Sequence, residues 1–165
     1  MSVSLTRLSI ALAAGFACAL AAPASAQLVQ KNLSIDTAVT IATTAMADCK
    51  AKGWNISVAV VGRSGELILH LRGDGTGPHT MENSFRKAYT SRTFRIPSAE
   101  MAKRLKDNPQ LGQVYLSNIV PAGGALPIKV GEEVIGAAGA SGAPGGDKDE
   151  ACVKAALDKH ADMLK

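Results

Sequence analysis

The sequence predicts an α+β fold in which an antiparallel sheet built from two hairpins is packed with helices. One observation is a pattern of two short strand-like segments separated by a glycine-containing turn. This pattern occurs twice in the chain. The other is a set of longer segments whose apolar residues recur at helical spacing. Their order is helix, hairpin, two helices, hairpin and helix. Because strands joined by a tight turn run antiparallel, neither hairpin can be parallel.

The first 26 residues have the pattern of a secretory signal peptide. Arg7 precedes an apolar run from Leu8 to Ala22, and small residues follow as far as Ala26. This run is shorter than the roughly 20 apolar residues that a membrane span requires. We therefore expect cleavage after Ala26, a periplasmic or extracellular location, and no membrane insertion after cleavage.

Residues 27–165 are predicted to form a single domain, because a chain of this length can bury one core without a second unit. Removing residues 1–26 takes away one of the 18 basic residues, which leaves 17 against 14 acidic residues. The basic residues are not interleaved with aromatic residues, which make up only 4% of the chain. Nucleic acid is therefore excluded as an expected partner.

The first helix and the first hairpin are predicted from local signals. The helix is expected between Ser34, placed to cap its start, and Gly53, placed to end it. The segment from Ile56 to Val61 is rich in β-branched residues and predicts a strand. A turn over residues 62–65 then leads to a second strand from Leu67 to Arg72.

A glycine-rich loop over residues 73–78 separates this hairpin from a second helix that begins near Thr80. Loops between rigid elements often carry binding residues. A shorter helix is expected from Ala99 to Lys106, and residues 108–118 are expected to be irregular. The second helix is predicted to bury one stripe of side chains, formed by Met81, Phe85, Ala88 and Tyr89.

The second hairpin is predicted over residues 125–140, with a turn at residues 131–132. Three glycines spaced three apart, Gly136, Gly139 and Gly142, indicate that another backbone or a flat ligand approaches this segment closely. In the last helix, Asp147 and Glu150 match a D-x-x-E capping arrangement, and we interpret Asp147, Asp149 and Glu150 as a helix cap.

Two long segments carry a resemblance to a known family. They are RGDGTGPHTMENSFRKAYTSRTF, from residue 72, and GGALPIKVGEEVIGAAGASGAPGGDKDEACVKAAL, from residue 123. The chain resembles the GlcG/HbpS family of haem-binding proteins, which is related to the C-terminal domain of PduO. The resemblance implies a profilin-like or Roadblock-like fold, assembly into homo-oligomers, and haem binding in some members. It also implies that the helices carrying Cys49 and Cys152 lie side by side, which would permit a disulfide in an oxidising compartment.

With this resemblance, His79 is the first candidate for a metal ligand, as the axial ligand of a haem iron. A haem pocket also needs apolar walls and cations for the propionates. The candidate haem-binding residues are therefore His79, Met81, Phe85, Arg86, Lys87 and Tyr89. The alternative for His79, a surface loop histidine, stays open. His70 and His160 are expected to be structural, since no H-E-x-x-H spacing occurs.

Two functions of different classes follow. One is an exported, non-enzymatic protein that binds or senses haem iron; the other is an enzyme that degrades haem or acts on a small acid. Ser141 lacks the G-x-S-x-G motif, and we assign no catalytic residue. A run of basic residues is either a solvated face of two helices or a site for propionates or another small anionic ligand. It comprises Arg86, Lys87, Arg92, Arg95, Lys103, Arg104 and Lys106.

Overall fold

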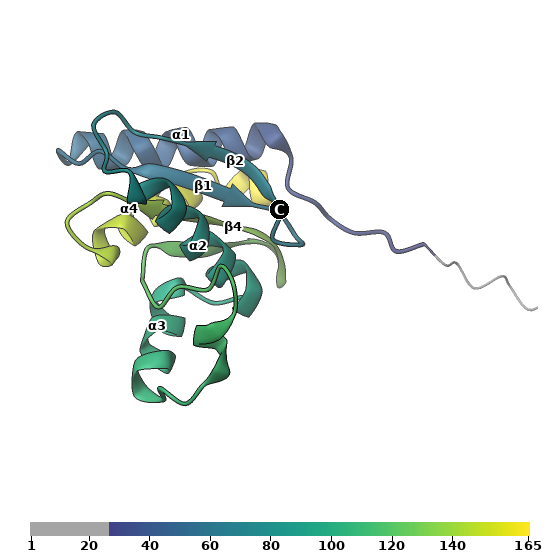
Figure 1. Cartoon of the computed structure of the whole chain (residues 1–165). Helices are drawn as coiled ribbons and strands as arrows, with labels where there is room; N and C mark the ends of the chain where they lie inside the picture. The colour runs from purple at the N-terminus through teal and green to yellow at the C-terminus, as the bar shows by residue number, and fades with distance from the viewer. Residues whose placement is uncertain (1–26) are drawn as a thin grey trace, which may run out of the picture. The chain divides into compact units, whose positions relative to one another are not determined.

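A four-stranded antiparallel sheet in the order β2-β1-β4-β3 organises the fold (Figure 1). The computed structural model describes residues 27–165, so the predicted signal peptide lies outside the described residues. Residues 31–165 form one compact unit. The strands are β1 (Ser57–Val61), β2 (Leu67–Leu71), β3 (Ala125–Val130) and β4 (Glu133–Ser141).

Each predicted hairpin is present, and the two are joined through their inner strands. β1 pairs with β2, and β3 pairs with β4, both antiparallel. β1 and β4 then pair with each other, in a register that places Ser57 opposite Ser141. The predicted α+β architecture is therefore confirmed.

Helices cover both faces of the sheet. They are α1 (Ile35–Ala51), α2 (His79–Phe94), α3 (Ser98–Asp107) and α4 (Gly146–Lys159), with short 3₁₀ turns at η1 (Gly112–Tyr115) and η2 (Ala161–Leu164). Alternate residues of β1 point to opposite faces. Val58 and Val60 belong to the core under α1 and α4, whereas Ala59 and Val61 pack with Ala88 of α2. Figure 1 shows α2 in front of the strands and α1 and α4 behind them.

The two helices behind the sheet are joined covalently. Cys49 of α1 and Cys152 of α4 form a disulfide, and both residues are fully buried. The predicted pairing is thus present in the structure. The helix boundaries also follow the predicted caps, because the Ser34 hydroxyl accepts a hydrogen bond from the Thr37 N–H and Gly53 follows the end of α1 with a φ of +83°.

The close approach expected at the glycines of the second hairpin is made by α2. A Cβ on Gly139 would lie 2.4 Å from the Ser84 carbonyl oxygen and 2.7 Å from the Ala88 backbone nitrogen. The absence of a side chain at Gly139 therefore lets α2 pack directly on β4.

Two predicted details are wrong. Of the stripe predicted for α2, Ala88 is fully buried but Met81, Phe85 and Tyr89 are only half-buried, and the other buried residues of α2 are mostly small or polar. The reason is the close packing on β4, which leaves no room for large side chains on that face. The D-x-x-E cap is also wrong, because α4 begins at Gly146 and no side chain caps it.

No helix within residues 27–165 is long and apolar enough to cross a membrane. The segment predicted as irregular, residues 108–118, contains only the single turn η1. Together with α3 it extends below the sheet in the view of Figure 1.

Candidate functional site

A cavity of about 740 Å³ opens at the end of the sheet where β4 ends and where α2 and α4 begin. Its wall is formed by loop residues and by the first turns of the two helices. The side chains that matter for its chemistry are Trp54, Thr76, His79, Asn83, Lys87, Ser141 and Asp149. We call this the His79 cavity.

A buried ion pair forms one side of the His79 cavity. The Lys87 ammonium lies 2.8 Å from the Asp149 carboxylate and also donates to the Ala140 carbonyl oxygen at 3.0 Å. The second carboxylate oxygen accepts from the Ala143 N–H at 3.0 Å. A Cβ on Gly124 would lie 2.8 Å from the Lys87 nitrogen, so only glycine leaves room for the pair.

Burial is the dominant electrostatic effect on the acids at the start of α4. It raises the pKa of Asp149, and the attraction of Lys87 and the Ala143 N–H opposes this rise without cancelling it. Burial also raises the pKa of Glu150, and the backbone N–H groups of Gly124 and Ala99 oppose this rise, while one oxygen of the Glu150 carboxylate is buried without a hydrogen bond. Neither acid caps α4, and burial disfavours the charged form of both.

Hydroxyl groups fix the glycine-rich loop that precedes α2. The Ser57 hydroxyl lies 3.2 Å from that of Thr76 and 2.8 Å from that of Thr80. Thr76 and Thr80 in turn donate to the carbonyl oxygens of Gly73 and Gly77. This network anchors the first turn of α2 on β1 and thereby sets the position of His79.

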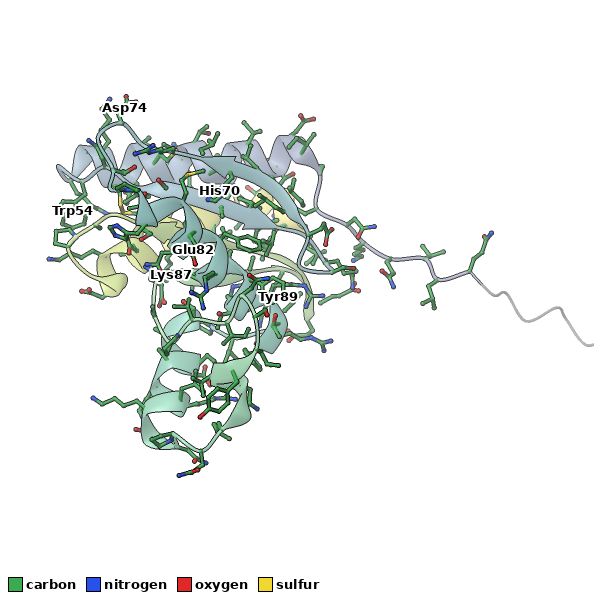
Figure 2. The ribbon with its side chains drawn as sticks, viewed as in Figure 1. Trp54, His70, Asp74, Glu82, Lys87 and Tyr89 are labelled. Atoms are coloured by element: carbon green, nitrogen blue, oxygen red, sulfur yellow. A yellow bond between two sulfur atoms is a disulfide. The ribbon has the colours of Figure 1, made fainter. Side chains whose placement is uncertain are left out.

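His79 is the first residue of α2 and lines the cavity from its exposed rim. Its imidazole makes no hydrogen bond to any residue in the described range 27–165. Trp54 lines the cavity as well, and Figure 2 shows it at the end of the sheet near the start of α4. The cavity thus offers one uncommitted imidazole and one large aromatic ring.

The structure brings together only two of the six predicted site residues, His79 and Lys87. Phe85 and Tyr89 pack against each other, with ring centroids 5.9 Å apart, and neither lines the cavity. Arg86 donates to the Ile119 carbonyl oxygen at 2.9 Å. Met81 is also outside the cavity lining.

The predicted basic face is divided. Lys87 is buried in its ion pair, while Lys103 and Arg104 are exposed and paired with acids on their own helix. Within residues 27–165, no group of three or more His, Cys, Asp or Glu side chains could hold a metal ion. His79 therefore stands alone as a candidate ligand in the cavity.

The other two histidines are bonded to protein groups, as expected for structural residues. His70 Nε2 lies 3.0 Å from the Ser84 hydroxyl, and His160 Nε2 lies 2.9 Å from the Thr44 hydroxyl. Burial lowers the pKa of His70, and a hydrogen bond with the Met81 backbone opposes this change.

Sequence reasoning missed Trp54 and Asn83 as cavity residues, and it assigned Asp149 to a helix cap. Asn83 donates to the Ser141 hydroxyl at 3.1 Å, and it follows His79 by one helical turn. That spacing is the one signal that could have identified Asn83. Nothing local in the sequence distinguishes Trp54, and the acids around Asp149 match a common capping pattern.

Comparisons with known proteins agree with this fold. A family model described as haem degrading protein HbpS-like matches residues 33–158. An uncharacterised 15.0 kDa protein from Citrobacter freundii, encoded in the dhaT-dhaS intergenic region, is 30% identical over 143 residues, covering 82% of this chain and all of that protein.

Solved structures give the same result. The crystal structure of HbpS has a TM-score of 0.78 at 32% identity, covering 85% of this chain and 98% of that one. The structure of a PduOC:heme complex has a TM-score of 0.69 at 19% identity, covering 76% of this chain and 93% of that one. At this identity it supports the fold alone. The family match spans most of the chain, so the protein belongs to the HbpS-like family.

Proposed function

We propose that this protein is an exported, non-enzymatic haem-binding protein and that haem binds in the His79 cavity. The observation that carries the proposal is the uncommitted imidazole of His79 at the rim of a cavity of about 740 Å³. Membership of a family described by haem chemistry supports the choice of ligand.

The residues of the cavity fit haem in three respects. Its volume falls within the range of roughly 300–1,000 Å³ that small-molecule sites occupy. His79 would provide the axial protein ligand of the haem iron. Trp54 provides an aromatic face that can stack on a flat macrocycle.

Charge at the cavity also favours an anionic ligand. The first turns of α2 and α4 both line it, and the N-terminal ends of helices carry partial positive charge. Lys87 lies on the same wall, although its charge is already balanced by Asp149. We therefore expect propionate groups to be held by backbone N–H groups of these turns.

Bound haem would supply an iron centre that accepts an axial ligand. The protein's own contribution would be to hold the His79 imidazole in place through the anchored first turn of α2. The buried Lys87–Asp149 pair would keep the start of α4 fixed against the cavity. Neither role requires a proton transfer, which is why we favour binding over catalysis.

A haem-degrading enzyme is the second candidate, because the family description names that activity. Titration of the purified mature protein with hemin, followed by ascorbate and oxygen, separates the two. A saturable Soret band that persists supports binding alone. Bleaching to a bilin-like spectrum supports degradation, and the absence of any Soret shift contradicts both.

Export is part of the proposal, and the disulfide supports it. A bond between Cys49 and Cys152 persists in an oxidising compartment and is rare in the cytosol. This agrees with the signal-peptide pattern of residues 1–26. We also propose that the protein forms homo-oligomers, as the family resemblance implies.

A further inference from the structure

A second charged cavity lies at the other end of α2, away from the His79 cavity. It has a volume of about 440 Å³ and is lined by Arg63, Arg92, Arg95, Glu132, Glu133 and Val134. These residues come from the β1–β2 turn, the end of α2, the β3–β4 turn and the start of β4. In Figure 2, Tyr89 marks this half of α2, and Trp54 marks the opposite end of the sheet. We call this second cavity the arginine cavity.

One donor in the arginine cavity is buried without a partner. The Nε atom of Arg92 is inaccessible to solvent and makes no hydrogen bond. A buried N–H of a charged group is costly when it is unpaired, so such atoms are rare in folded proteins. Because this atom is covered, a ligand in the cavity would meet the terminal nitrogens of Arg92 instead, which make no hydrogen bond within residues 27–165.

Arg95 supplies a second guanidinium with unused donors. It follows the end of α2 in a left-handed conformation, with a φ of +58°, and its side chain is exposed. It has no hydrogen bond or ion pair within residues 27–165. The left-handed conformation is a common way for a helix to end, so it is the unpaired guanidinium, and not the backbone of Arg95, that points to a ligand.

The remaining charges of the arginine cavity are already committed. Arg63 donates to Glu133 at 2.6 Å and to the Lys31 carbonyl oxygen. The nearby Glu66 carboxylate accepts from the Ser64 N–H at 2.8 Å. Glu132 is exposed at the rim and pairs with neither free arginine. Arg92 and Arg95 are thus the two cations left for a ligand.

The cations of the arginine cavity repel one another. Burial lowers the pKa of Arg92, and the charges of Arg95 and Arg63 lower it further, while Glu66 acts in the opposite direction. An anion placed between Arg92 and Arg95 would relieve this repulsion.

We propose that Arg92 and Arg95 form a binding site for a small dianion, either a phosphate group or a dicarboxylate. The planar guanidinium group presents paired donors that match the oxygens of both kinds of anion. A cavity of about 440 Å³ leaves room for an organic substituent beyond the anionic group. Attraction to the negative end of the α2 dipole would account for the position of Arg95, but it leaves the terminal nitrogens of Arg92, in the same cavity, without a hydrogen bond.

The test is isothermal titration of the mature protein with inorganic phosphate and, separately, with succinate, against sodium chloride at matched ionic strength. We expect saturable binding of at least one of the two, which also identifies the preferred anion. Arg92→Lys keeps the charge but loses the paired donors of the guanidinium group, and Arg95→Gln removes an exposed charge with little risk to folding. Each should weaken binding by about tenfold or more.

Arg104→Gln is the matched control, because Arg104 is exposed and paired with Glu100 on α3. It should bind the anion as the wild type does. The proposal is overturned if the wild type shows no saturable binding, or if both variants bind the anion with unchanged affinity. It is also overturned if the variants lose anion binding only because their oligomeric state has changed. Hemin titration of the same variants should be unaffected, so failure of the anion site and failure of the haem proposal can be told apart.

Discussion

The Lys87 ammonium lies 2.8 Å from the Asp149 carboxylate, and the two side chains are only 4% and 3% exposed. The pair joins α2, on one face of the sheet, to α4, on the other. It does so beside Gly124, at the end of the sheet where the His79 cavity opens. This contact is the link between the fold and the candidate site.

Lys87→Met should lower the free energy of unfolding by about 3–5 kcal/mol, because it leaves the Asp149 carboxylate buried without its cation. Urea unfolding at pH 7 measures the change. The control is Lys154→Met, which breaks an exposed pair with Asp158 and should cost no more than about 0.5 kcal/mol. Equal effects of the two substitutions would contradict the role of the buried pair.

The cost of Lys87→Met should also depend on pH. Burial raises the pKa of Asp149 above its ordinary value of 3.8, so the folded state binds this proton more tightly than the unfolded chain does. Protonated Asp149 therefore contributes to the free energy of unfolding, and this contribution is lost as the pH rises from about 3.8 through the raised pKa. Removing Lys87 raises the pKa further, so the deficit should be greatest at neutral pH and should shrink below about pH 4. A deficit that is independent of pH would contradict this.

Gly139→Ala should destabilise the protein by about 1–3 kcal/mol, since the new Cβ would collide with the backbone of α2. Gly112→Ala is a suitable control because a Cβ there meets no atom within 4 Å. Thermal and urea unfolding of the two variants should differ clearly. A neutral Gly139→Ala variant would show that α2 can move away from β4 at no cost.

Loss of the disulfide in a Cys49→Ala/Cys152→Ala variant should reduce stability by about 2–5 kcal/mol. The same bond predicts that the mature protein, denatured without reductant, contains no titratable thiol. Detection of two thiols per chain under these conditions would show that the pair is reduced in the isolated protein.

Export predicts that the protein recovered from the periplasm or medium begins at Gln27 or at its pyroglutamate form. Intact-mass spectrometry reads this directly. An unprocessed chain that retains Met1 in the cytoplasm would contradict both the cleavage site and the proposed location.

The hairpins could be predicted because their signals are local. The turns at residues 62–65 and 131–132 sit between strand-forming segments, and the structure has both. The buried side of α2 could not be predicted from its own residues. The largest apolar side chains of α2 are those of Met81, Phe85 and Tyr89. The face of α2 that packs on the sheet is nevertheless determined by Gly139, on a strand more than 40 residues later.

The candidate site shows the same limit. His79 and Lys87 were predicted and lie in one cavity, but the partner of Lys87 was assigned to a helix cap. Asp149 is 62 residues from Lys87, so only the folded chain brings the charges together. Local patterns identify caps and turns, whereas a pair between distant helices leaves no local signal.

Hemin titration of His79→Ala beside the wild type tests the central proposal most directly. Loss of the imidazole should weaken binding and shift the Soret band, because the iron must then take a weaker ligand or water. His70→Ala is the control, since His70 lies outside the cavity and bonds to Ser84; it should bind hemin with the wild-type spectrum. If His79→Ala binds hemin with unchanged affinity and an unchanged band, His79 is not the ligand and the assignment of haem to this cavity is wrong.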